Sequence, residues 1–201
     1  MLIDLHTHST AHSACSAASP DDLCRAAKEA GLDGICITEH DAFWPEVAVR
    51  ELGEKHGIVV LRGVEATTEV GHVLVYGLST WRKGLSTLAA LREHVMAEGA
   101  LMFLAHPSRR YGRPVEGSLA DIFDSLEVAN ASEGALQNAN ALELARGCRL
   151  PGIGGSDAHT AREVGAAYTV LANSVADEGG LVAELRKALH STAVRRLTAE
   201  E

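Results

Sequence analysis

Short apolar runs alternate with longer amphipathic segments along most of the chain. Runs of this kind are typical of strands buried on both faces, and the segments between them carry the residues that start and stop helices. A strand–helix alternation predicts βα units around a largely parallel sheet. We expect strands at 2–5, 34–38, 58–64, 71–77, 100–105, 125–129, 153–155 and 167–171, and helices at 20–30, 45–55, 85–98, 119–123, 135–146 and 181–190.

Several boundaries have a local physical cause. Ser19 can cap a helix that begins at Pro20, and glycine ends the expected helices at Gly31 and Gly147. The run 71–77 follows the preceding strand so closely that we expect the two to form a hairpin.

The 201 residues are enough for one domain with a buried core. They hold too few βα units for a full eight-unit barrel, which typically takes ~250 residues. We therefore predict a single α/β domain over 1–201, built as a smaller closed or nearly closed barrel. The polar tail after about residue 191 is expected to fray.

Composition excludes several classes of protein. The net charge of −9 and an aromatic content of 4% argue against a basic, base-stacking nucleic-acid surface. No apolar run approaches the ~20 residues that span a bilayer, and Asp4 and His6 interrupt any signal-peptide core. The four cysteines form no CxxC pair, which favours reduced thiols. We expect a cytoplasmic protein.

Histidines gather where strands are expected to end. His6 and His8 leave the first strand as an i, i+2 pair, so both imidazoles point to one face. Asp157 and His159 repeat that spacing after a late strand. Seven of the ten histidines lie in or next to such loops, and the other three, at helix positions 56, 94 and 190, are interpreted as surface residues. The seven are His6, His8, His12, His40, His72, His106 and His159.

The carboxyl ends of the strands of a βα barrel open onto one face, so these loops should meet there. Imidazoles together with carboxylates, and without thiolates, suit Zn, Mn or Fe. The sequence therefore predicts a metal site.

The motifs also resemble those of a known family, the polymerase-and-histidinol-phosphatase (PHP) metal-dependent phosphoesterases. The resemblance rests on DLHTHS (4–9), TEHD (38–41), GVE (63–65), GHVL (71–74), AHP (105–107), EVAN (127–130) and SDAH (156–159). It implies a distorted seven-stranded (β/α)7 TIM-like barrel that holds two or three divalent metal ions at its carboxyl face.

The resemblance also implies ligands for three metal positions. The first is His6, His8, Glu65 and Asp157, the second is Glu65, His72 and His106, and the third is His40 with His159. Relatives often have Asp five residues after the second His of HxH, where this chain has Ser13, so we expect His12 to substitute as a ligand. Glu39, where Asp is common, and Asp41 are expected to support the ligands from behind.

A reaction follows from these expectations. Two metal ions ~3.5–4 Å apart can generate a hydroxide and clamp an in-line displacement at phosphorus. Glu65, Asp157 and His159 are then the residues closest to the chemistry. Arg109 and Arg110 follow the AHP motif and could hold a phosphate. The expected substrate is a small anionic phosphomonoester, such as a nucleotide or histidinol phosphate, and stable nucleic-acid binding is not expected.

Three alternatives stay open. One is an exonuclease-type phosphodiesterase acting on oligonucleotide ends. Another is a metal-dependent amidohydrolase, which the lack of a lysine at a strand end disfavours. The third is a non-catalytic metal-binding domain, which Ser13 keeps open.

Overall fold

The computed structural model describes residues 1–109 and 115–195, and its strands form one mixed sheet in the order β7-β6-β5-β4-β3-β2-β1-β8-β9. The strands are β1 (Leu2–Thr7), β2 (Gly34–Ile37), β3 (Val59–Thr68), β4 (Gly71–Tyr76), β5 (Leu101–Leu104), β6 (Ser125–Asn130), β7 (Gly152–Gly155), β8 (Ala167–Val170) and β9 (Ser191–Val194). The helices are α1 (Pro20–Glu29), α2 (Glu46–His56), α3 (Leu88–Glu98), α4 (Leu119–Ile122), α5 (Ala135–Cys148) and α6 (Glu178–Arg186), with a 3-10 turn, η1, at Ala161–Glu163.

The sheet is parallel in two blocks, β1-β2-β3 and β5-β6-β7, and antiparallel around β4 and β8. The segment after β7 then returns to β1. Its Asp157 N–H donates to the carbonyl of His6 at 2.8 Å, and the N–H of His8 donates to the carbonyl of Ala158 at 2.9 Å. These bonds nearly close the sheet into a barrel.

The α/β barrel prediction is confirmed, but the sheet has nine strands among the described residues, where the family resemblance implied seven. Two features of the connections explain the difference. The expected hairpin brings β4 in antiparallel to β3. The residues after α6 form β9, which pairs with β8 and shows that the tail does not fray at Ser191.

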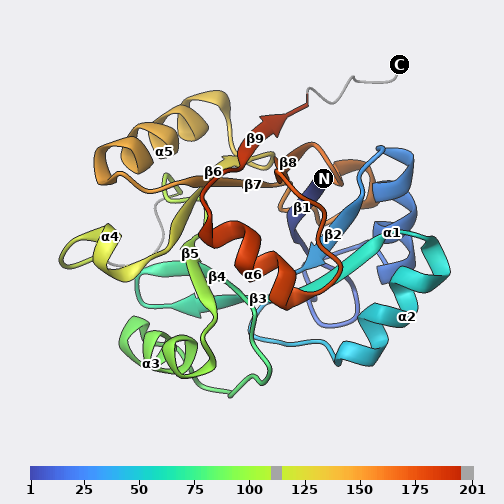
Figure 1. The fold of residues 1–201 in the computed structure, drawn as a ribbon, viewed down its shortest axis with the longest axis horizontal. Coiled ribbons are helices and arrows are strands. Elements are labelled where there is room, and N and C mark those ends of the chain that lie inside the picture. The colour runs from blue at the N-terminus through green and yellow to red at the C-terminus, as the bar shows by residue number, and fades with distance from the viewer. Residues whose placement is uncertain (110–114, 196–201) are drawn as a thin grey trace.

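The barrel interior is apolar below the carboxyl ends of the strands. One buried cluster draws side chains from β1, β3, β4, β5 and β7, so it fills the space that the sheet encloses. Tyr76 crosses this space and donates its hydroxyl to the carbonyl of Leu5 at 2.9 Å. Leu181 and Leu185 of α6 complete the cluster, and Figure 1 shows α6 lying across the middle of the molecule.

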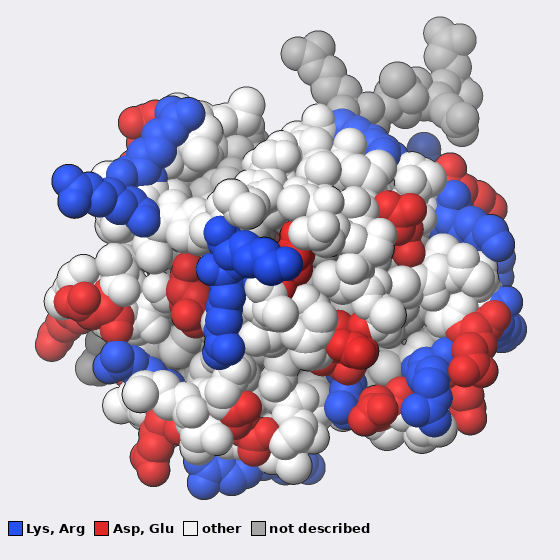
Figure 2. All heavy atoms as spheres, in the orientation of Figure 1, with Lys and Arg blue, Asp and Glu red and all other residues white. Residues whose placement is uncertain are grey.

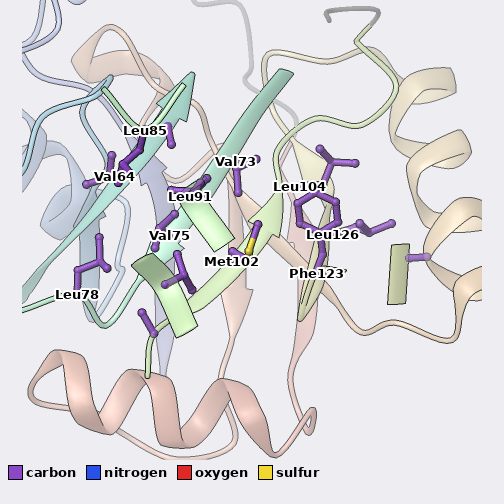
Figure 3. Close-up of a cluster of buried hydrophobic side chains, with 14 of the residues drawn as sticks. Val64, Val73, Val75, Leu78, Leu85, Leu91, Met102, Leu104, Phe123 and Leu126 are labelled. Atoms are coloured by element: carbon purple, nitrogen blue, oxygen red, sulfur yellow. The ribbon is translucent and has the colours of Figure 1, made fainter. Parts of the chain in front are cut away.

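Two further clusters cover the outside of the sheet. Val73, Val75 and Met102 point away from the interior toward Leu91 of α3 and Ala141 of α5, the cluster drawn in Figure 3. On the other side, α1 and α2 pack on β2, where Ile35 and Ile37 alternate with the inward-facing Cys36. Apolar side chains on both faces explain why the strands are continuous apolar runs in the sequence.

Two local predictions were wrong. Gly147 does not end α5, which continues to Cys148 and closes with Arg149 in the left-handed conformation. His94 is not a surface residue, because it lies on the buried face of α3 and its ring hydrogen-bonds the carbonyl of Thr80 at 3.0 Å. The Ser19 cap is confirmed, with Asp22 as its reciprocal partner.

The surface drawn in Figure 2 carries both signs of charge. Blue and red side chains are interspersed over the described part of this face, so it forms no patch of a single sign despite the net charge of −9. Among the described residues, no helix combines the length and the apolar character needed to cross a bilayer.

Candidate metal centre

The candidate centre lies at the carboxyl ends of the strands, above the apolar interior. Glu65 follows Leu61 on the inward face of β3, and His72 precedes Leu74 on the inward face of β4. The antiparallel register pairs Glu65 with Leu74 and Thr67 with His72, so His72 lies two residues nearer the turn of the hairpin than the partner of Glu65. The hairpin therefore brings a carboxylate and an imidazole together at the mouth of the barrel.

Glu65 is the hub of the centre. Its carboxylate is 1% exposed, and five imidazoles from four segments of the chain surround it. The Oε2 atom lies 3.3 Å from His6 Nε2, 3.1 Å from His8 Nε2 and 3.1 Å from His40 Nδ1. The Oε1 atom lies 2.8 Å from His72 Nδ1 and 3.1 Å from His106 Nε2.

Asp157 provides the second carboxylate. Its Oδ1 atom lies 3.5 Å from His6 Nε2 and 3.3 Å from His8 Nε2. The Nδ1 atom of His159 lies 2.8 Å from the carbonyl of Asp157, and its ring, tilted by 37°, has its centre 4.6 Å from that of His8. Asp157 has a φ of 56°, a conformation that costs energy in residues other than glycine and clusters at functional sites.

Glu127 lies behind His6. Its Oε1 atom lies 2.9 Å from His6 Nδ1, while its Oε2 atom accepts the backbone N–H of His106 and the side-chain amide of Asn130. Glu127 was not among the site residues predicted from the sequence. The sequence contained an indication of its role, because an acid inside an apolar strand is buried and needs hydrogen-bond donors around it.

The charges of the cluster are strongly perturbed. Burial alone would lower the pKa of His6, but Glu127, Asp157 and Glu65 outweigh it and raise that pKa well above its ordinary value. Burial opposes ionisation of Glu65, yet the surrounding histidines hold its pKa well below its usual range. Burial lowers the pKa of His40 to about 4, so this ring is neutral at pH 7 and offers a lone pair.

Three sets of side chains have ligand atoms within 4.8 Å of one another: His6, His8, Glu65 and Asp157; His40, Glu65 and His72; and His8, His40 and His159. The first set matches the predicted first position in full. The second contains His40 in place of the predicted His106, although His106 also contacts Glu65. The third contains His8 in addition to the predicted pair.

The donor set fits divalent cations. The Nε2 atoms of His6 and His8 converge to 3.0 Å, so the two side chains are directed at one point. Glu65 Oε2 is buried and has no hydrogen-bond partner despite the three imidazoles around it. Lone pairs of imidazoles and carboxylates that converge on one point are what Zn, Mn and Fe sites use.

The structure does not bring His12 into the cluster. The His12 side chain is exposed and packs edge-on against Trp44, with ring centres 5.3 Å apart. The next residue, Ser13, is buried instead, and its hydroxyl lies between His8 and Glu39.

The two supporting acids differ. Glu39 lies behind the cluster as expected, fully buried, and accepts hydrogen bonds from Ser9, Ser13 and Trp44. Asp41 is exposed, and the side-chain bond described for it is to the backbone N–H of Thr67 at 2.9 Å. It therefore ties the loop after β2 to β3.

A cavity of about 200 Å³ opens onto the cluster, lined by His40, Glu65, His72, Arg109, Asp157 and His159. Arg109, the predicted phosphate-binding residue, lies at this cavity. Its guanidinium donates to Glu133 at 2.5 Å and to Asp157 at 3.0 Å. Arg110 lies outside the described residues.

This barrel, with a histidine- and carboxylate-lined cavity at its carboxyl face, defines an α/β-barrel protein with a candidate metal centre. A model of the PHP domain matches residues 4–145, and a PHP-associated model matches residues 135–188. The chain belongs to the PHP domain family.

Two curated proteins show how the family varies. An error-prone DNA polymerase of Cutibacterium acnes is 31% identical over 136 residues, which are 60% of this chain and 11% of the polymerase. A phosphoribosyl 1,2-cyclic phosphate 1,2-diphosphodiesterase of Eggerthella lenta is 33% identical over 97 residues, 45% of this chain and 35% of that protein.

Among solved structures, a two-domain protein of Bacteroides vulgatus contains a predicted PHP-like metal-dependent phosphoesterase. It matches with a TM-score of 0.77 and 22% identity, over 97% of this chain and 65% of that chain, which shows a shared fold. The chain thus spans less than two thirds of the length of each of these relatives.

Proposed function

We propose that the protein is a metal-dependent phosphoesterase that hydrolyses a small phosphomonoester. The observation that carries the proposal is the Glu65 carboxylate, which five imidazoles surround at the floor of a cavity that Arg109 borders. The similarity to a diphosphodiesterase supports phosphoester chemistry, while the cyclic diester in its name belongs to that relative.

The proposed cofactors are two or three divalent ions, Mn, Zn or Fe. When bound, such ions lower the pKa of water toward ~7 and neutralise phosphoryl oxygens. His6, His8, Glu65 and Asp157 would hold one ion, and Glu65 would share a second with His72, His106 or His40. His8, His40 and His159 would hold a third without a carboxylate, so we expect this position to bind most weakly.

The side chains around the cavity have different proposed roles. Glu65 and Asp157 stay ionised, because their histidine neighbours hold both pKa values below the ordinary range. Arg109 has a guanidinium, a group suited to binding phosphate, and its hydrogen bonds to Glu133 and Asp157 hold it at the cavity. His159, which is half-buried, also lines the cavity.

The cavity argues for a small substrate. A volume of about 200 Å³ lies below the ~300–1,000 Å³ of typical ligand pockets. It suits a terminal phosphate with a short attachment rather than a bound polymer. The net charge of −9 also disfavours stable nucleic-acid binding, and the four unpaired cysteines fit a reducing cytoplasm.

The test is release of inorganic phosphate from mononucleotides, nucleoside bisphosphates, sugar phosphates and histidinol phosphate. Metal-stripped protein is compared with protein given Mn, Zn or Fe. We expect metal-dependent release concentrated on one substrate class. Parallel assays on a cyclic diester, oligonucleotide ends and an amide would redirect the proposal if they alone showed turnover, and verified metal loading with no turnover would favour a binding domain.

Two histidine variants sharpen this test. His8→Ala should abolish turnover without unfolding the barrel, because His8 is a candidate ligand in two of the three sets. His12→Ala should leave turnover intact, because His12 is exposed against Trp44. Equal losses in the two variants would contradict the ligand assignment.

A further inference from the structure

We infer that Ser13 and Glu39 form a positioning relay that fixes the ring of His8 for metal binding. The inference rests on the proposed metal centre but not on the phosphoesterase reaction. It assigns a role to a buried serine that contacts two of the candidate ligand segments at once, His8 through its ring and His40 through its backbone.

The hydroxyl of Ser13 has one proton, and its position follows from its neighbours. Ser13 Oγ lies 2.5 Å from Glu39 Oε2, and a carboxylate can only accept, so Ser13 donates to Glu39. The backbone N–H of His40 donates to Ser13 Oγ at 3.3 Å. The hydroxyl oxygen therefore has only a lone pair to offer to His8 Nδ1, which lies 3.4 Å away.

His8 must therefore donate from Nδ1 to make this contact. That leaves Nε2 as its metal-binding nitrogen, and Nε2 is the atom that lies 3.1 Å from Glu65 and 3.3 Å from Asp157. Metal-ligating histidines commonly have the other ring nitrogen fixed in this way by a carboxylate. The relay selects the tautomer that the centre needs.

His6, the other histidine of the HxH motif, has the same arrangement without an intervening serine, because an acid contacts its Nδ1 atom directly. His6 Nδ1 lies 2.9 Å from Glu127, and His6 Nε2 points at the cluster. Both histidines of the HxH motif thus have a buried acid behind Nδ1, with a serine inserted for His8. Glu39 and Glu127 are both at most 1% exposed, so each charge acts in a medium of low polarity.

Ser9 offers a matched control. Its hydroxyl also donates to Glu39, at the other oxygen, and its backbone N–H donates to Glu39 as well. Ser9→Ala and Ser13→Ala each remove one hydroxyl donor from the same carboxylate, but only Ser13 connects it to the ring of His8. The turn around Ser13 is held by backbone bonds to Ser9 and Ser16, so Ser13→Ala should fold.

The experiment measures metal affinity and the His8 ring directly. Zn²⁺ affinity is determined by competition with a chromophoric chelator, and the Nδ1–H proton of His8 is followed by NMR in the Zn²⁺-loaded protein. We expect Ser13→Ala to weaken Zn²⁺ binding by about 10–100-fold and to lose the exchange-protected Nδ1–H signal. Ser9→Ala should keep that signal and most of the affinity.

A double variant tests whether Glu39 acts through Ser13. If it does, Ser13→Ala with Glu39→Gln should bind Zn²⁺ no more weakly than Ser13→Ala alone. Additive losses, or equal effects of Ser9→Ala and Ser13→Ala on both readouts, would overturn the relay. Neither readout requires turnover, so a negative phosphatase assay would leave this test intact.

Discussion

At the residue scale, the centre concentrates groups that would be costly anywhere else in the fold. Glu65 and Glu127 are acids buried to at least 99%, and His106 and Asp157 adopt positive φ. Burial of an unpaired charge costs far more than a hydrogen bond returns, so each acid persists only because imidazoles and backbone N–H groups face it. Such costly groups are expected at a functional site rather than in a core that serves stability alone.

Glu127→Gln should weaken the centre from behind. The carboxylate accepts from His6, His106 and Asn130 with both oxygens, whereas an amide would turn an N–H₂ group toward one of those donors. We expect stability to fall by ~1–3 kcal/mol, the cost of an unsatisfied buried donor, and metal affinity to fall by about 10–100-fold. Urea unfolding and a chelator competition measure the two effects.

The matched control is Glu133→Gln, whose described side-chain contact is with Arg109 rather than with a histidine. It should leave metal affinity unchanged. If both variants lowered affinity equally, long-range charge rather than the contact with His6 would be responsible.

At the scale of elements, the barrel closes because β7 is nearly without side chains. Its sequence is Gly-Ile-Gly-Gly, and a Cβ on Gly155 would lie 2.4 Å from His6 Cβ and 2.7 Å from His6 N. A Cβ on Gly154 would lie 2.7 Å from the carbonyl of Tyr168. The glycines therefore let β7 approach β1 and β8, and this approach places Asp157 beside His6.

Gly155→Ala should disturb both the fold and the centre, because backbone and Cβ atoms of a strand cannot give way easily. We expect a loss of ~1–3 kcal/mol in the free energy of unfolding, together with weaker metal binding. Gly147→Ala is the control: it lies within α5 with nothing within 4 Å, and it should stabilise by up to ~1 kcal/mol. A neutral Gly155→Ala would contradict the tight approach.

Glu98, in the last turn of α3, accepts hydrogen bonds from the loop after β4, and their contribution to stability should depend on pH. Hydrogen bonds from the Ser79 side chain and backbone and from Thr80 lower the pKa of Glu98 to about 2, against 4.5 for an ordinary glutamate. Because the folded pKa is the lower one, the stabilisation is present above pH 4.5 and is lost as the pH falls toward 2.

Glu98→Gln should therefore be less stable than wild type at pH 7, and the gap should narrow as the pH drops to 4 and below. Urea midpoints of the two proteins, measured at each pH, give the result. A gap that stays constant with pH would show that the charge of Glu98 contributes nothing.

At the scale of the whole molecule, the sequence predicted the barrel and most of the centre because both follow from local pattern. Strand ends are marked by apolar runs, and the carboxyl ends of barrel strands share a face, so His6, His40 and Glu65 could be brought together. What could not be predicted depends on contacts between distant segments. The addition of β9 beside β8, the burial of Ser13 in place of His12, and Glu127 behind His6 each require the closed fold.

Because those segments meet only in the folded chain, metal binding should stabilise the whole barrel. The first set joins β1, β3 and the loop after β7, which are far apart in the unfolded chain, so the unfolded state should bind metal weakly. At a free metal concentration of about 100 times Kd, linkage gives ~2.7 kcal/mol, and each kcal/mol shifts the Tm of a domain this size by ~2–4 °C. The Tm of chelator-treated protein should therefore rise on addition of Mn²⁺ or Zn²⁺.

Two variants and the pH test this rise in Tm. His12→Ala should keep the rise and His8→Ala should lose it. The rise should also become smaller toward pH 5, because protons compete with the metal ion for the imidazoles. A rise of the same size in His8→Ala would place the bound ion elsewhere on the molecule.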